Sequence, residues 1–286
     1  MGPCIVTAAL TGVLTNPTRH NVPVTPEEMA AEAKAAQDAG ATVVHIHFRN
    51  QTPGMGHLPT WDPEVAAEIV DAIRAEAPRV LINCSTGMVG PDISGPLGVL
   101  RRVKPEIAAM NSGSLNYLKV RSNGDWAWPP MLFDNPLNKI QEYLDVMNEI
   151  GCVPEYECFD TGIVRSVELF RRAGLLKPPF HISFVMGVSS GMPARAELLP
   201  ILLDEAIEGA HCQSIVIGRT EVWGVHRRMA ELGGDVRTGL EDTFYLPNGD
   251  KATSNGTLID ALVGIVREVG REPATYEETR SAYGLE

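Results

Sequence analysis

Two histidines separated by one residue carry the clearest chemical signal in this sequence. His45 and His47 stand in the segment VVHIHFR, residues 43–49. Because side chains alternate across a strand, both imidazoles would lie on one face and the apolar residues between them on the other. Imidazole nitrogens are common ligands of Zn²⁺, so the pair predicts two ligands of a metal site. The alternative is a pair of hydrogen-bonded histidines in a protein core.

A carboxylate that could complete such a site lies near the end of the chain. Catalytic zinc usually has three protein ligands and one open position. Glu241 and Asp242 end the segment VRTGLED, residues 236–242, and Arg237 stands close to both. A cation within a few Å favours the charged form of a partly buried carboxylate. We therefore expect this segment to belong to the site, the alternative being a solvated acidic loop.

Two other segments combine residues suited to binding or acid–base chemistry. The segment NCSTGM, residues 83–88, places hydroxyl and glycine residues after an apolar run. Backbone N–H groups and hydroxyls at such a position can hold an anionic oxygen, although an ordinary turn is the alternative. Glu155 and Glu157 alternate along residues 153–159 and share one face. Two acids on one buried face either line a polar interior or serve the site.

Alternating strands and helices must position these residues. Short apolar runs predict the strands, and capping residues such as Thr25 with Glu28 predict helix starts. The expected strands are residues 4–10, 41–48, 80–84, 107–111, 153–159, 181–186, 214–218 and 235–238. The expected helices are residues 26–39, one from 62, one from 134 to 151, and 162–173, 194–208, 222–232 and 255–270, followed by a polar tail.

This alternation predicts the fold class. Strands alternating with helices indicate parallel βαβ units. Eight such units in 286 residues without a linker favour a single (β/α)8 TIM barrel, residues 1–286, over an open doubly wound sheet. Catalytic groups of such barrels lie at the C-terminal ends of the strands, which is where the candidate residues fall.

Composition excludes several classes of protein. There are 24 basic and 36 acidic residues, a formal net charge of −12, which argues against a nucleic-acid partner. No apolar run approaches the roughly 18 residues that a membrane span needs, and the N-terminal segment does not resemble a signal peptide. The five cysteines are scattered and predict buried, reduced thiols. We therefore expect a cytoplasmic protein with a small-molecule substrate and no membrane partner.

Short motifs along nearly the whole chain resemble the β-keto acid cleavage enzymes. The resemblance implies a zinc-dependent TIM barrel that transfers an acyl group between a β-keto acid and acetyl-CoA, with acetoacetate and a new acyl-CoA as products. It also suggests a homotetramer. The motifs are TAA at 7–9 with TG at 11–12, PVTPEE at 23–28, HIHFR at 45–49, STG at 85–87, KPE at 104–106, GSLNY at 113–117, PEYE at 154–157, Gly187 with GM at 191–192, IGR at 217–219, RTGLED at 237–242 and SN at 254–255.

The resemblance also implies roles for individual residues. Zn²⁺ would make the carbon beside the keto group more acidic, and a general base would remove a proton from it before the enolate attacks acetyl-CoA. The implied set is His45, His47 and Glu241 as zinc ligands, Asp242 with Arg237 as general base, Glu157 as a further acid, Ser85 with Thr86 and Gly87 as the holder of the substrate carboxylate, and Asn111 and Leu14 as other substrate-binding residues.

Two departures from the family pattern bear on the substrate. Ala109 stands where relatives tend to have a hydroxyl residue, a contact that Ser112 could supply. Leu14 and Thr15 stand where an enzyme acting on an amino-bearing acid would be expected to place an acid, so we expect a neutral or anionic tail. Arg19, turned inward, would favour the anionic one.

Two other functions remain open from the sequence. A metal-dependent aldolase or decarboxylase would use the same residues without acetyl-CoA. A metal-binding or ligand-sensing barrel without turnover is a further alternative, but such a protein has no reason to keep a base.

Overall fold

Eight strands form the inner layer of the molecule, which a computed structural model describes for residues 2–285. They are β1 Val6–Thr11, β2 Val43–Ile46, β3 Leu81–Cys84, β4 Ile107–Asn111, β7 Val153–Cys158, β8 His181–Met186, β9 His211–Val216 and β10 Asp235–Thr238. All neighbouring pairs are parallel, and they close in the order β1-β10-β9-β8-β7-β4-β3-β2. The predicted (β/α)8 barrel is confirmed.

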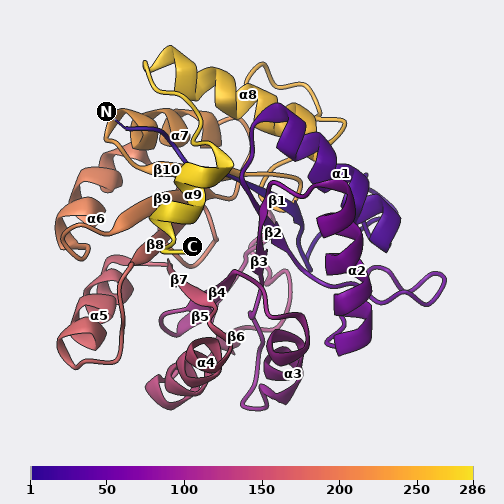
Figure 1. The fold of residues 1–286 in the computed structure, drawn as a ribbon, viewed down its shortest axis with the longest axis horizontal. Coiled ribbons are helices and arrows are strands. Elements are labelled where there is room, and N and C mark those ends of the chain that lie inside the picture. Colours follow the sequence, from indigo (N-terminus) through magenta and orange to yellow (C-terminus); the bar gives the residue numbers. More distant parts are fainter. Residues whose placement is uncertain (1, 286) are drawn as a thin grey trace.

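Helices form an outer ring around these strands (Figure 1). The expected start of the first helix is confirmed, because Thr25 and Glu28 make a reciprocal capping box and Gly40 ends the helix with φ 113°. The helices are α1 Pro26–Ala39, α2 Pro63–Glu76, α3 Ser94–Val103, α4 Leu137–Ile150, α5 Thr161–Arg172, α6 Leu199–Glu205, α7 Val222–Glu231, α8 Asn255–Glu268 and α9 Tyr276–Ala282.

Three elements were not expected from the sequence. Helix α3 begins at Ser94 without a side-chain cap and contains two glycines and a proline, so its local signal is weak. A hairpin of β5 Leu115–Tyr117 and β6 Met131–Phe133 lies between β4 and α4. Helix α9 lies in the segment that we interpreted as a polar tail, which was wrong, since Thr275 and Glu278 form another capping box there.

The bounds of α6 and β9 also differ from the prediction. Helix α6 is shorter than expected because residues 196–198 form a 3₁₀ turn before it. Strand β9 covers His211–Val216 and not residues 214–218, since its pairing with β8 starts at His211.

A hydrogen-bonded polar cluster occupies part of the barrel interior. Outward-facing strand residues such as Val44 and Ile46 pack in the main apolar core beneath the helices. Inside the barrel, Gln213 Nε2 donates to Glu155 Oε1 at 2.9 Å, and Asn83 and Ser183 also donate to the Glu155 carboxylate. Glu155 therefore lines a hydrogen-bonded interior, as one of the two alternatives for it predicted.

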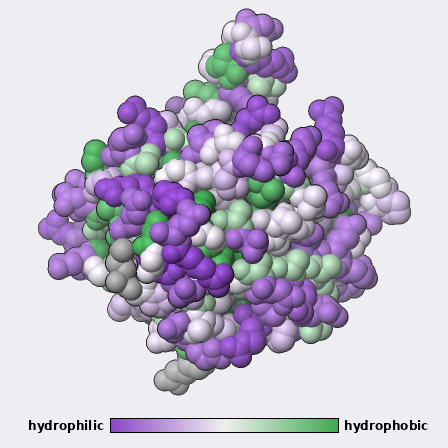
Figure 2. Space-filling model, turned by 90° about the horizontal axis from the view of Figure 1, so that it is seen from above, coloured by the Kyte–Doolittle hydropathy of each residue, from purple (hydrophilic) through white to green (hydrophobic). Residues whose placement is uncertain are grey.

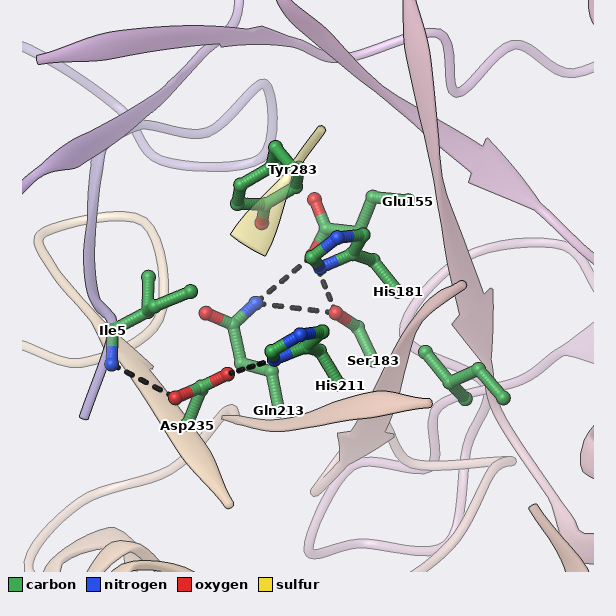
Figure 3. A pocket seen from close by; sticks show the side chains of 9 residues that line it. Ile5, Glu155, His181, Ser183, His211, Gln213, Asp235 and Tyr283 are labelled. Carbon is green, nitrogen blue, oxygen red and sulfur yellow. Dashed lines mark hydrogen bonds and ion pairs between the residues drawn. The ribbon is translucent and has the colours of Figure 1, made fainter. Parts of the chain in front are cut away.

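The last helix covers the N-terminal end of the barrel. Tyr283, just after α9, packs with inward apolar residues of the barrel including Val43 and Leu81. Its ring stacks on His181 at 3.7 Å, and His181 stacks on His211 at 4.9 Å. A cavity of about 10 Å³ remains beside these rings (Figure 3), the volume of about one water molecule.

The surface and the cysteines agree with the expectations from composition. Seen from the side of α8, the surface is mainly hydrophilic with small hydrophobic areas between (Figure 2). Among residues 2–285, no helix is long and apolar enough to cross a membrane. All five cysteines are buried and free.

Candidate active site

Three side chains that could bind a metal ion converge at the C-terminal mouth of the barrel. His45 comes from β2, His47 follows that strand, and Glu241 follows β10. Their ligand atoms all lie within 4.8 Å of one another. Glu241 Oε1 is 3.7 Å from His45 Nε2 and 3.4 Å from His47 Nε2. Bonds of about 2.1 Å to a tetrahedral Zn²⁺ place ligand atoms roughly 3.4 Å apart, so the geometry suits such an ion.

Barrel closure and two glycines bring Glu241 to the histidines. Strand β1 lies between β2 and β10, and Ala9 pairs with His45 while its carbonyl accepts the Glu241 N–H at 3.2 Å. A Cβ on Gly239 would lie 2.1 Å from the Ala9 carbonyl oxygen, and one on Gly12 would lie 2.6 Å from Glu241 Cγ. Only glycine permits both close approaches.

The protonation states of these groups suit metal binding. Burial, with help from Arg237, holds the pKa of His45 well below its usual value, so the imidazole is neutral. Burial opposes ionisation of Glu241, but His47 and Arg237 hold its pKa far below the usual range. Glu241 Oε2 is buried and has no hydrogen-bond partner among the described residues. A bound cation would satisfy that oxygen.

One buried cation, Arg237, binds the carboxylates next to this cluster. Its Nε and Nη2 atoms donate to the two oxygens of Asp242 at 3.1 Å each. Nη2 also donates to Glu241 at 2.7 Å, and Nη1 lies 3.5 Å from Glu157 Oε1. The side chains of Arg237 and Asp242 are only 2% and 1% exposed. The expected pairing of Arg237 with Asp242 is therefore present in the structure.

Burial makes both of the remaining acids more basic than usual. It raises the pKa of Asp242 to about 7, and Arg237 offsets only part of that effect. Burial likewise raises the pKa of Glu157, again against Arg237. We expected Arg237 to keep the carboxylate ionised, and burial proves the larger of the two effects. A carboxylate with a pKa near neutrality is a suitable general base.

The loop after β3 offers Ser85 and Gly87 to the mouth but turns Thr86 away. The Thr86 hydroxyl donates to the Ala109 carbonyl, and the Thr86 carbonyl accepts from the Tyr143 hydroxyl at 3.0 Å. Gly87 N–H lies 3.4 Å from Ser85 Oγ. The substrate-binding role implied for Thr86 stays a prediction that its hydroxyl contact does not support.

Asn111 and Ser112 follow this loop around the barrel. Asn111 ends β4 and pairs in register with Glu157, so it lies at the same mouth. The Ser112 hydroxyl donates to the Met110 carbonyl at 3.1 Å. Its proton is thus engaged in this structure, and its role as a substitute for the hydroxyl that Ala109 lacks stays a prediction.

The loop after β1 lies partly apart from this cluster. Leu14 is 73% exposed. Arg49, which the sequence analysis did not single out, is fully buried and donates to the Thr15 carbonyl at 2.9 Å and to the Gly12 carbonyl. The sequence signals for Arg49 are its place in the HIHFR motif and a charge directly after the histidine strand. Arg49 holds the loop that borders Glu241.

Comparison with known proteins places the chain in one family. The sequence profile of the beta-keto acid cleavage enzymes matches residues 3–285. The chain belongs to this family. As a β-keto acid cleavage enzyme it resembles the 3-keto-5-aminohexanoate cleavage enzyme of Fusobacterium nucleatum, with 34% identity over 98% of this chain and 97% of the relative.

Two further comparisons support this family assignment and its fold. The 3-oxoadipate:acetyl-CoA acetyltransferase of Cupriavidus necator is 32% identical to this β-keto acid cleavage enzyme over 99% of this chain and 95% of the relative. The apo structure of ObcA matches with a TM-score of 0.68 and 21% identity, over 92% of this chain and 65% of that chain. That likeness shows the fold alone.

Proposed function

We propose that this enzyme condenses a β-keto acid with acetyl-CoA and releases acetoacetate and a new acyl-CoA, with Zn²⁺ held by His45, His47 and Glu241. The observation that carries the proposal is the position of Asp242. This buried carboxylate is held by Arg237, which also contacts the ligand Glu241. The C. necator relative, whose name joins 3-oxoadipate and acetyl-CoA, supports the co-substrate.

The residues at the mouth divide the work of the first step. A bound Zn²⁺ would supply a Lewis acid for the keto oxygen, which acidifies the neighbouring carbon. Ser85, Gly87 and Asn111 hold the substrate carboxylate, and Asp242 accepts a proton from the carbon between the keto and carboxyl groups. Arg237 fixes the orientation of Asp242 through two N–H donors.

Two carbon–carbon bond changes then complete the transfer. The deprotonated carbon attacks the acetyl carbonyl, and the bond from that carbonyl to sulfur breaks to release CoA thiolate. The thiolate attacks the original keto carbon, whose bond to the central carbon breaks. The electron pair returns to the central carbon, which takes back the proton from Asp242. Glu157, on the other side of Arg237, is the further acid of the site.

The loop after β1 favours a neutral or anionic tail on the β-keto acid. Residues 12–21 contain no acid that could bind an ammonium group. Arg19 is exposed and not turned inward, so it gives no support to the anionic tail over the neutral one. Thr15 is held in place by Arg49. The name of the C. necator relative includes a keto acid with an anionic tail.

The test is one mass-spectrometric assay. The purified enzyme is incubated with acetyl-CoA and β-keto acids that have neutral, anionic or amino tails, with and without a chelator. New acyl-CoA products that disappear on chelation and return with Zn²⁺ are expected. Loss of the keto acid without acyl-CoA formation would instead indicate the aldolase or decarboxylase. Turnover of amino-bearing acids alone would contradict the proposed tail.

A further inference from the structure

The β5–β6 hairpin brings an aromatic ring to the mouth of the barrel. Phe133 ends β6 and pairs with Leu115, which is buried in the main core. Asn135 N–H donates to Ser114 Oγ at 2.7 Å, which ties the two ends of the hairpin together. The base of this hairpin is therefore fixed to the barrel, and the half-buried Phe133 has a defined position.

The Phe133 ring lies against the loop that is proposed to hold the substrate carboxylate. A Cβ placed on Gly87 would lie 3.8 Å from Phe133 Cζ, 3.7 Å from Asn111 Nδ2 and 3.8 Å from Ser85 Oγ. Three side chains from three different segments thus surround one point that the missing Gly87 side chain leaves open. Two of them are polar, and the third is the edge of an aromatic ring.

A second aromatic residue holds this ring in place. Phe133 meets Phe159 edge to face, with centroids 6.0 Å apart and planes at 83°. Phe159 is buried and stands two residues after Glu157 at the end of β7. Edge-to-face pairs are favourable and restrict the orientation of both rings. The segment at the end of β7 therefore carries both the acid Glu157 and the ring that positions Phe133.

We propose that Phe133 is a specificity-determining residue that limits substituents on the carbon between the keto and carboxyl groups. This inference rests on the proposed function, which places the substrate carboxylate on the Ser85–Gly87 loop. The central carbon is one bond from that carboxylate. A ring edge 3.8 Å from the point where a Gly87 Cβ would stand leaves little room for a methyl group there, because protein interiors are packed closely. Phe133 thus selects unbranched β-keto acids.

Three variants and two acids test this inference. The acids are 3-oxohexanoate and its 2-methyl derivative, which give the same acyl-CoA product. Phe133→Ala is expected to raise the ratio of kcat/KM for the branched acid to that for the unbranched acid by about tenfold or more, the usual range for one methyl group in a pocket. Phe180→Ala removes a half-buried ring next to the N-terminal end of β8 and should leave the ratio unchanged.

Gly87→Ala fills the space beside the Phe133 ring, whereas Phe133→Ala enlarges it. Its new Cβ would make ordinary contacts of 3.7–3.8 Å, so the protein should fold normally. It should raise KM even for the unbranched acid, because it fills the open point. Thermal unfolding of all three variants checks that they are folded.

The outcomes separate this inference from the proposed function. If the wild-type enzyme forms acyl-CoA and Phe133→Ala has the same selectivity as Phe180→Ala, the inference fails. If the wild type forms no acyl-CoA, the proposed function fails. The inference about Phe133 is then tested by calorimetric binding of unreactive 3-hydroxyhexanoate and its 2-methyl derivative. Selective gain of affinity for the branched compound in Phe133→Ala supports the inference, and its absence overturns it.

Discussion

Arg237 is the residue on which the electrostatics of the barrel mouth depend. It is buried, and it contacts Glu157, Glu241 and Asp242. Three acids around one cation carry more negative charge than Arg237 can neutralise. Burial also raises the pKa of Asp242 and Glu157, because it disfavours their charged forms. A divalent cation on the two histidines and Glu241 would restore the balance of charge, which links the metal site to the base.

Replacing Asp242 separates catalysis from metal binding. Asp242→Asn keeps the size of the side chain but cannot accept the proton, so kcat should fall by about 10²–10⁴-fold. Zinc content, measured by mass spectrometry of the metal, should stay the same as in the wild type because Asp242 is not among the three clustered ligands. Wild-type turnover in this variant would remove Asp242 from the mechanism.

Replacing Glu241 should weaken zinc binding itself, in contrast to replacing Asp242. Glu241→Gln removes the anionic ligand, and we expect zinc affinity to fall by at least about tenfold, with turnover falling at limiting zinc. Glu208→Gln, at an exposed position outside the mouth, is the matched control. Equal zinc binding in the two variants, measured by competition with a chelating dye, would contradict the assignment of Glu241 as a ligand.

At the scale of elements, α9 is attached to the barrel through a histidine that must stay neutral. His181 Nε2 lies 3.2 Å from the Ala282 carbonyl and therefore carries the proton as donor. Burial, with His211 nearby, lowers the pKa of His181 to about 3. A group whose pKa is depressed by folding contributes stability that is present above its unfolded pKa and is lost as pH falls below it.

Protonation of His181 in acid should therefore destabilise the packing of α9 against the barrel and lower the free energy of unfolding. We expect Tm to fall between about pH 6.5 and pH 3 and expect His181→Phe, which retains a stacking ring, to show a smaller fall. Asp235, whose pKa burial raises to about 7, acts in the opposite direction, so the difference between the two proteins is the measured quantity. His57→Phe, on an exposed loop, is the control. Identical pH profiles for wild type and His181→Phe would contradict the expectation.

At the scale of the whole molecule, exposed apolar residues concentrate on one segment. The β5–β6 hairpin and the start of α4 lie next to each other in the chain, and several of their large side chains face solvent. These are Val120, Trp126, Met131, Leu132 and Leu137, which are 40–56% exposed. Concentrated apolar surface of this kind marks association sites.

This segment gives a physical reason for the homotetramer that the family resemblance predicts. Light scattering of the purified 31.0 kDa chain should show a species of four times that mass. Trp126→Glu should shift the distribution toward smaller species, because it places a charge on the apolar segment. Leu169→Glu, a similarly exposed leucine on α5, is the control. A monomer at micromolar concentration would contradict the prediction.

Local patterns in the sequence were enough to predict the barrel and most of the residues that meet at its mouth. Alternation placed His45 and His47 on one face, and caps such as Thr25 located helix starts, because both depend on neighbours in the chain. The sequence also predicted which acids could join the histidines. It missed α3 and the β5–β6 hairpin, whose local signals are weak, and it missed α9 although Thr275 and Glu278 carry the capping-box pattern.

Only the tertiary structure decided how these groups meet. Closure of the barrel through β1 brings Glu241 to His47, and burial, which no local pattern reports, makes Asp242 more basic than its neighbour Arg237 alone would allow. The same packing turned the Thr86 hydroxyl toward the Ala109 carbonyl and brought Phe133 to the loop at Gly87. Residue type and spacing determine which chemistry is available, but distance and burial depend on contacts between segments far apart in the chain.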